Sequence, residues 1–392
     1  MSRSHINSLP PMVRYPAALW RQHLVPEEWE ACLDAWLALA DAHLSLSNSD
    51  FVRISSKDES LATYLTSYAA ETSGSSDQPE SEKARNLKRK SFLLMLRVLD
   101  GEHVHPDLLK WNFITNTARL YGRVNGSRLA AIAWRKHTSE TETSLSNLKS
   151  ALIRNLDAGL KGDLKSTEAQ LKRLNHLLHI SPDTAGFFMA GSDFLDSLVS
   201  CFKLMNPPLR KAILSTTYLC LVGLTEGEKP SFSTLIDQLY SLKIAAEAHK
   251  AGPTNANDSL AANLVSQTPV LKQLQSKLGK SEQARARPVI ADLESYKIPG
   301  VVMRPPQRLI KKRAEKGKGK AAENGFGDGY EQMHIHRMSL ITQVQDLFPD
   351  LGSGFIVKLL DEYGENVEIV ISHLLEGSLP AHLESADRSE DL

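Results

Sequence analysis

Few side chains in this chain have the types and spacings that metal binding requires. His103 and His105, and His334 and His336, form two His-x-His pairs. No cysteine or carboxylate cluster at zinc-like spacing completes either pair to four ligands. All four are therefore expected to be ordinary surface histidines, and the sequence predicts neither a bound metal nor a cofactor.

Catalytic motifs are equally scarce. The chain contains no GxxxxGK[ST], GxSxG or HExxH motif, and no GxGxxG follows an expected strand. Its three cysteines, Cys32, Cys201 and Cys220, lie far apart inside apolar helical patterns and in no nucleophile motif. They are predicted to be reduced core residues. The sequence thus predicts a protein that is not an enzyme.

A basic run near residue 315 is the one local electrostatic feature. Clustered lysines bind the phosphates of nucleic acids by releasing counterions, and this binding does not depend on the base sequence. A weak contact with ribosomal RNA is therefore one interpretation of the run. A nuclear localisation signal and a merely solvated linker are the other interpretations. No aromatic residue interleaves the run, which argues against stacking on single-stranded nucleic acid. Its residues are Lys311, Lys312, Arg313, Lys316, Lys318 and Lys320.

Residues 337–380 are predicted to form a small independent unit of three helices. Apolar residues recur there at helical spacings. Pro349 ends the first helix, Ser353 is the expected N-cap of the second, and Gly364 and Gly377 are the expected ends of the second and third. The apolar stripes are Leu340, Val344 and Leu347; Ile356, Leu359, Leu360 and Tyr363; and Val367, Val370, Ile371 and Leu374.

Two apolar pairs in this unit need a separate explanation. A domain of about 40 residues lies at the lower limit of independent folding, so an exposed large apolar side chain is costly there. Phe348-Pro349 and Leu374-Leu375 nevertheless stand where polar residues are expected, and Leu375 is not needed by the apolar stripe. They indicate a docking surface, and the alternative is that all four belong to the core of an ordinary three-helix bundle.

This stretch resembles the CUE ubiquitin-binding domains, whose marks are a Phe-Pro after the first helix and a di-leucine at the end of the third. The family usually has Met before Phe-Pro, whereas this chain has Leu347, an apolar side chain of similar volume. The resemblance implies that Leu347, Phe348, Pro349, Leu374 and Leu375 bind the apolar patch of ubiquitin and of polyubiquitin chains.

The rest of the chain predicts an all-α protein. Residues 1–279 are expected to form a large irregular helical domain, in which helical apolar stripes follow one another without a fixed repeat. Residues 280–336, rich in Pro, Gly and Lys, are expected to be a flexible linker, and 381–392 a polar tail. The clearest stripes are Trp29, Leu33, Trp36, Leu37, Ala40 and Leu44; Leu61, Tyr64, Leu65 and Tyr68; and Leu145, Leu148, Leu152, Leu156 and Leu160.

The N-terminal half carries a second, fainter set of marks, and the C-terminal run VQDLFPDLGSGFI belongs to the same pattern. The marks of the N-terminal half are Asp50-Phe51, Asp58-Glu59-Ser60-Leu61, Tyr68, Arg89, Phe92, Leu93, Leu96, Arg97, His105-Pro106 and Asn112-Phe113. In this order they resemble the family of subunit 2 of the activating signal cointegrator complex, whose fungal counterpart is the CUE-domain subunit of the ribosome-quality-control trigger complex. The resemblance implies a non-catalytic adaptor. Its helical domain would hold a large Ski2-like RNA helicase, and its CUE domain would read lysine-63-linked ubiquitin on stalled or collided ribosomes, which the helicase then dissociates.

Composition limits the partners further. Lys plus Arg and Asp plus Glu number 46 each among 392 residues, so no net charge draws the protein to nucleic acid or to a membrane. No apolar run has the length of a signal peptide or a membrane span. A cytoplasmic protein, also nuclear if the basic run is a signal, is expected. The alternatives are a CUE adaptor in an endocytic or degradative ubiquitin pathway, or one acting with the same helicase in alkylation-damage repair or transcription coactivation.

Overall fold

The computed structural model describes the chain in two units, Met1–Arg308 and Leu309–Leu392. In the first unit it describes residues 9–21, 23–56, 58–74, 81–250 and 256–298. In the second it describes residues 344, 345, 348, 351–363, 370, 373, 374, 379, 380 and 383. Helices account for the regular structure of these residues and none of them is in a β-strand, which confirms the all-α prediction.

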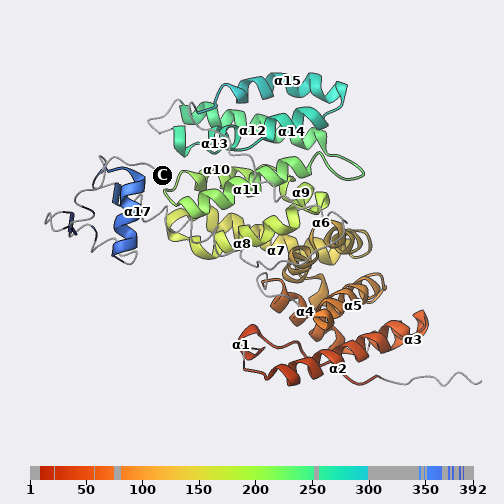
Figure 1. Ribbon diagram of the computed structural model, residues 1–392. Coiled ribbons are helices and arrows are strands. Elements are labelled where there is room, and N and C mark those ends of the chain that lie inside the picture. The colour runs from red at the N-terminus through yellow and green to blue at the C-terminus, as the bar shows by residue number, and fades with distance from the viewer. Residues whose placement is uncertain are drawn as a thin grey trace, which may run out of the picture. The chain divides into compact units, whose positions relative to one another are not determined.

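The helices of the first unit pack on one another largely in chain order (Figure 1). Helix α2 packs on α5, α4 on α6, α6 on α8, α8 on α11, and α12 on α15. Their bounds are α1 Ala18–Arg21, α2 Pro26–Ser45, α3 Asn48–Ser55, α4 Glu59–Thr72, α5 Glu82–Leu99, α6 Trp111–Lys136, α7 Thr138–Asp157, α8 Leu164–Leu178, α9 Pro182–Met189, α10 Asp193–Phe202, α11 Pro207–Gly223, α12 Phe232–Lys250, α13 Leu260–Gln267, α14 Val270–Lys277 and α15 Lys280–Glu294, with short 3-10 turns η1 Pro106–Leu109, η2 Gly159–Lys161 and η3 Ala256–Asp258.

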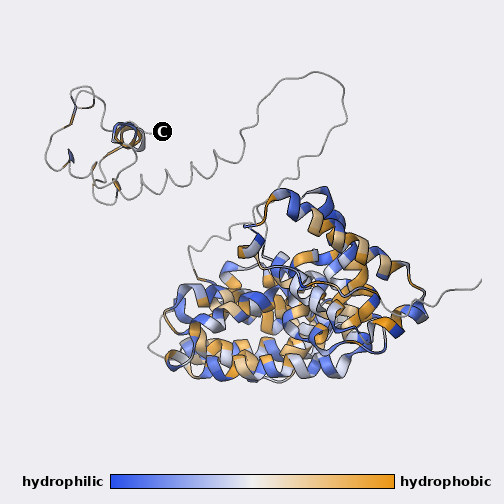
Figure 2. Ribbon diagram, turned by 90° about the horizontal axis from the view of Figure 1, so that it is seen from below, coloured by the Kyte–Doolittle hydropathy of each residue, from blue (hydrophilic) through white to orange (hydrophobic). Residues whose placement is uncertain are grey.

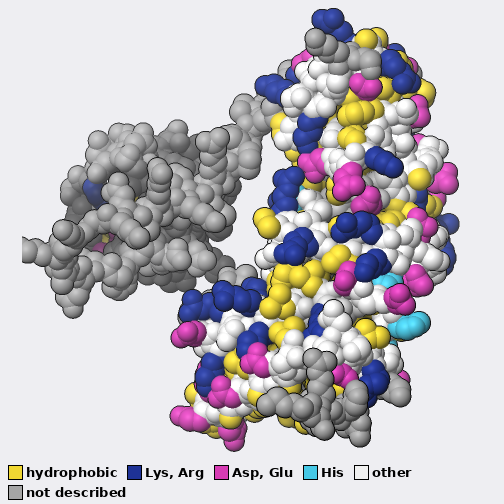
Figure 3. All heavy atoms as spheres, turned by 90° about the vertical axis from the view of Figure 1, so that its right-hand side faces the viewer, with side chains coloured by type: hydrophobic (Ala, Val, Ile, Leu, Met, Phe, Trp, Pro, Cys, Tyr) yellow, Lys and Arg dark blue, Asp and Glu magenta, His cyan; other side chains and the backbone are white. Residues whose placement is uncertain are grey.

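The first unit encloses one continuous apolar core. Leu33, Trp36 and Ala40 of α2 are buried in it, and so are Tyr64 and Leu65 of α4, as their helical spacing predicts. Figure 2 shows apolar and polar residues alternating along these helices, as amphipathic helices require. The face of this unit in Figure 3 carries Lys and Arg interspersed with Asp and Glu, which agrees with the balanced composition.

Local signals explain where most helices begin. Pro26 and Pro207 occupy the first helical position, where a missing N–H costs nothing. Ser47 and Asn206 accept a hydrogen bond from the backbone N–H three residues ahead, as N-cap side chains do. The sequence predicts a helix that Pro207-Pro208 begin and that runs to about Gly223, and α11 has these bounds.

Two details of the predicted helices were wrong. The stripe of α7 stops at Leu156, because the helix ends at Asp157 and Leu160 lies 81% exposed on the following turn. The sequence pattern from Ser259 to about Leu278 predicts a single helix, but this segment forms two helices, α13 and α14, separated at Thr268 and Pro269. Proline lacks the N–H that a continuous helix would use at that point.

The predicted start of the flexible linker was also wrong. Residues 280–294 form helix α15, which packs on α12 although Pro288 lies inside it. Its buried residues Ala286, Val289, Ile290 and Leu293 stand at i, i+3, i+4 and i+7, so an apolar stripe outweighs the proline. Residues 299–336 of the expected linker lie outside the described residues.

Candidate functional site

The candidate site lies on the second unit, which has an apolar core of its own. Helix α17, Ser353–Glu362, supplies Phe355, Ile356, Leu359 and Leu360, all fully buried. Val344, Val370 and Leu383 complete the buried cluster. The helix begins after Gly352, which carries no capping side chain, so the expected Ser353 cap was one residue out. A separate core means that this unit can present a surface independently of the first.

Phe348 is held by a short series of backbone bonds at the edge of this core. Its N–H donates to Val344 O over 2.9 Å, and its carbonyl accepts from Leu351 N over 3.2 Å. Gln345 Nε2 donates to Leu351 O over 3.3 Å and closes the same turn. The side chain of Phe348 is half-buried and packs against the core while part of it remains open to solvent.

Leu374 has the same intermediate burial. It packs against the core cluster and is not enclosed by it. The residue before it, His373, stacks on Tyr363 at the end of α17, with ring centroids 4.6 Å apart and planes 14° apart. This aromatic pair was not predicted, because no spacing rule connects residues ten positions apart that lie on different elements. It joins the segment carrying Leu374 to α17.

The structure therefore describes two of the five predicted binding residues, Phe348 and Leu374, and leaves both half-exposed. Leu347, Pro349 and Leu375 lie outside the described residues, so the complete surface stays a prediction. The prediction of a polar tail over residues 381–392 was wrong at Leu383. This side chain is 4% exposed and belongs to the core of the unit. Leu383 thus contributes to the packing of this unit.

The residues considered for other chemistry have structural roles where they are described. His105 caps η1 by accepting from Asp107 N over 3.3 Å, and His103 is exposed. Cys201 and Cys220 are buried, Cys32 is half-buried, and burial raises the pKa of Cys220 far above its ordinary value. Such a thiol stays protonated and is a poor nucleophile. His334, His336 and the basic run Lys311 to Lys320 lie outside the described residues.

The described residues contain neither a cluster of metal ligands nor a membrane-spanning helix. No group of three or more His, Cys, Asp or Glu side chains there could hold a metal ion. None of the helices that the structure describes is both long and apolar enough to cross a membrane.

Comparison with known families identifies the second unit. The sequence model of the CUE domain matches residues 337–378. The C-terminal segment of this chain is a CUE domain. Its match begins at the boundary predicted from the sequence and covers α17 together with Phe348 and Leu374.

The CUE segment also matches two curated proteins. "Activating signal cointegrator 1 complex subunit 2" of Mus musculus is 50% identical over 50 residues, which are 13% of this chain and 7% of the mouse protein. The Homo sapiens protein of the same name is 49% identical over 53 residues, 14% of this chain and 7% of its own length. The chain thus aligns with only 7% of the length of these relatives.

A chain in the crystal structure of a DNA repair complex, ASCC3-ASCC2, is similar over 73% of this chain and 91% of its own length. The sequence identity is 15% and the TM-score is 0.43. At that TM-score the likeness does not establish a shared fold for the helical unit.

Proposed function

We propose that this protein is a non-catalytic ubiquitin-binding adaptor, in which the CUE domain supplies the ubiquitin contact. The observation that carries the proposal is the CUE match at residues 337–378, with Phe348 and Leu374 half-exposed on the edge of a separate core. An apolar side chain that is fixed by its backbone and open to water is ready to bind another apolar surface. Leu347, Pro349 and Leu375 are proposed to complete that surface.

A surface of five apolar side chains gives weak binding to a single ubiquitin. Interfaces below about 1,200 Å² in total belong to the weak, transient class. A chain of several ubiquitins, or a second contact through the helical unit, raises the effective concentration without any new contact. The proposed adaptor therefore recognises its target by the coincidence of two weak contacts.

The helical unit is proposed to hold a partner in a larger complex. The curated relatives are named as a subunit of the activating signal cointegrator 1 complex, which supports membership of a complex of that kind. We propose that the partner is a large RNA helicase and that the target is a stalled or collided ribosome carrying lysine-63-linked ubiquitin, in the cytoplasm. Transcription coactivation or DNA repair with the same helicase is the second candidate, and the name of the curated relatives favours transcription coactivation.

Capture of ubiquitin chains tests the proposal directly. The full-length protein is immobilised and offered lysine-63-linked and lysine-48-linked chains. Phe348→Ala combined with Leu375→Ala is expected to abolish capture, whereas Val357→Ala, a half-buried residue of α17 outside the predicted surface, is expected to keep it. Equal capture by the double variant and the unaltered protein would refute the ubiquitin site.

Copurification from cell extract separates the pathways. A helicase and ribosomal proteins retained by the unaltered protein support the ribosome proposal. Coat or proteasome components support an endocytic or degradative pathway instead, and transcription or repair factors without ribosomes support the second candidate. The Phe348 and Leu375 double variant distinguishes partners held through ubiquitin, which it loses, from partners held by the helical unit, which it keeps.

A further inference from the structure

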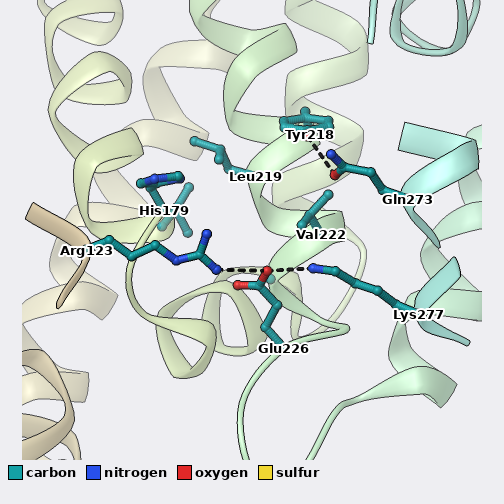
Figure 4. A pocket seen from close by; sticks show the side chains of 10 residues that line it. Arg123, His179, Tyr218, Leu219, Val222, Glu226, Gln273 and Lys277 are labelled. Atoms are coloured by element: carbon teal, nitrogen blue, oxygen red, sulfur yellow. Dashed lines mark hydrogen bonds and ion pairs between the residues drawn. The ribbon is translucent and has the colours of Figure 1, made fainter. Parts of the chain in front are cut away.

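A cavity of about 490 Å³ lies in the helical unit where α6, α8, α11 and α14 meet. Its volume is within the range of small-molecule and peptide-side-chain sites. Figure 4 shows Arg123 of α6 and Lys277 of α14 approaching Glu226 from opposite sides. Leu178, Leu219 and Val222 give the cavity an apolar lining. Arg123, Glu226 and Lys277 come from distant parts of the sequence, so no sequence motif identifies this site.

Two backbone features position the charged groups. Gly122 has a φ of 66° and interrupts α6, so that Arg123 opens the second half of the helix. Gly227 has a φ of 86° and follows Glu226 in the turn between α11 and α12. Both conformations are open to glycine and strained for other residues.

Cations outnumber carboxylates in the cavity. Arg123 Nη2 lies 3.4 Å from Glu226 Oε1, and Lys277 Nζ lies 2.6 Å from the same oxygen. The side chain of Arg123 nevertheless remains 63% exposed and that of Lys277 34% exposed. A guanidinium carries five N–H donors and an ammonium three, so a single carboxylate oxygen leaves most of these donors available.

The neutral polar groups of the cavity add to the excess of donors. Burial raises the pKa of Tyr218, so its hydroxyl stays protonated and donates to Gln273 Oε1 over 2.7 Å. That bond uses the acceptor of Gln273 and leaves its amide N–H groups for a ligand. His179 adds a further ring nitrogen at the end of α8.

We propose that this cavity binds a carboxylate of a partner protein, presented as an Asp or Glu side chain next to an apolar residue. The carboxylate would bridge Arg123 and Lys277, and the neighbouring apolar side chain would pack on Leu219 and Val222. Planar pairing of a guanidinium with a carboxylate is the strongest form of this contact. This site is distinct from the CUE surface and does not depend on ubiquitin binding.

The alternative explanation is that the ion pairs of Arg123 and Lys277 with Glu226 only stabilise the packing of the helices. The two explanations predict opposite effects of changes to Glu226. If it competes with a ligand carboxylate, Glu226→Gln frees two cations and strengthens binding, while Arg123→Gln and Lys277→Gln weaken it. If the network only joins the helices, Arg123→Gln and Lys277→Gln each remove one ion pair and Glu226→Gln removes both, so none of the three changes should strengthen peptide binding.

Calorimetric titration of the full-length protein tests the proposal. The probes are acetyl-Leu-Glu-Asp-Leu-amide and its uncharged analogue acetyl-Leu-Gln-Asn-Leu-amide, at low and high ionic strength. We expect salt-sensitive binding of the acidic peptide only, several-fold weaker binding by the Arg123 and Lys277 variants, and several-fold tighter binding by Glu226→Gln. Lys110→Gln, which breaks an exposed ion pair elsewhere on the unit, is the matched control and should bind as the unaltered protein does.

Three outcomes would overturn the proposal. The first is that neither the unaltered protein nor Glu226→Gln binds the acidic peptide. The second is that Glu226→Gln weakens binding together with the other two variants, which would mean that the ion pairs only support the structure of the site. The third is that inorganic phosphate binds through Arg123 and Lys277 and the acidic peptide does not, which assigns the cavity to phosphoryl groups. Thermal unfolding of each variant identifies any loss of fold, and the 63% exposure of Arg123 makes its variant the safest of the three.

Discussion

Tyr363 and His373 stack face to face in the CUE domain, with ring centroids 4.6 Å apart and planes 14° apart. The pair joins the end of α17 to the segment that carries Leu374. A domain this small has few contacts with which to fix one segment against another. The stack therefore sets the position of Leu374 relative to the buried core.

If the proposed ubiquitin surface is correct, loss of the stack should weaken it. His373→Ala is expected to reduce the affinity for ubiquitin several-fold, because Leu374 loses its orientation, whereas His373→Phe restores an aromatic ring and should recover most of the affinity. Calorimetric titration with single ubiquitin measures both. Equal weakening by the Ala and Phe variants would indicate that His373 contacts ubiquitin itself and does not act through the stack.

Arg97 is predicted to be the most important cation for stability in the first unit. Its guanidinium donates to His43 O, Leu44 O and Leu46 O at 2.9, 3.0 and 2.6 Å, and lies 4.2 Å from the ring centroid of Phe51. It thereby satisfies carbonyls at the end of α2 that lack helical partners.

A lysine cannot reproduce this fork of donors, so Arg97→Lys should lower the free energy of unfolding by about 2 kcal/mol. Urea denaturation measures the change. Arg135→Lys, at an exposed position of α6, is the control and should shift stability by less than about 0.5 kcal/mol. A similar small shift in both variants would show that the carbonyls at the end of α2 are satisfied by water.

His43 is predicted to make stability depend on pH. It is fully buried, neither ring nitrogen has a hydrogen-bond partner, and its ring packs edge-on against Phe51. Burial lowers the pKa of His43 below its ordinary value of 6.5, the charge of Arg97 lowers it further, and Asp58 opposes the shift.

The sign follows from proton binding. Below pH 6.5 the unfolded chain takes up a proton at His43 while the folded protein keeps the ring neutral, so folding stability falls as the pH falls towards the lowered pKa. His43→Phe removes this dependence. Urea midpoints at about pH 7.5 and about pH 5.5 should therefore differ less for the variant than for the unaltered protein. Parallel pH profiles would show that His43 does not titrate differently in the two states.

The sequence predicted the helical class and the CUE segment because both depend on local patterns. Apolar spacing identified Leu33, Trp36 and Tyr64 as core residues, and Pro207 and Gly223 are the local start and stop signals of α11. The Phe348 and Leu374 marks could be recognised for the same reason. Their exposure was one of two interpretations, a docking surface or a buried core, because it depends on how three short segments pack.

The sequence could not predict contacts between residues far apart in the chain. Arg123, Glu226 and Lys277 meet only because α6, α11 and α14 pack together, and each is an unremarkable surface charge in its own segment. Leu383 is a different kind of error. Its neighbours in the sequence are polar, so the segment was predicted to be a tail, but Leu383 packs into the core. Composition describes a segment as a whole and misses a single buried side chain.

Helix α15 is the subject of the last prediction. Its proline content favours a linker, whereas its apolar spacing favours a packed helix. Ile290 is 3% exposed and lies on the buried stripe of α15, which packs on α12, while Arg287 on the same helix is exposed. In the full-length protein, Ile290→Ala should lower the free energy of unfolding by about 2–4 kcal/mol, since it leaves a cavity in a packed core. Arg287→Ala should change it by less than about 0.5 kcal/mol. Urea denaturation compares them, and if both substitutions were silent, residues 280–294 would belong to the linker after all.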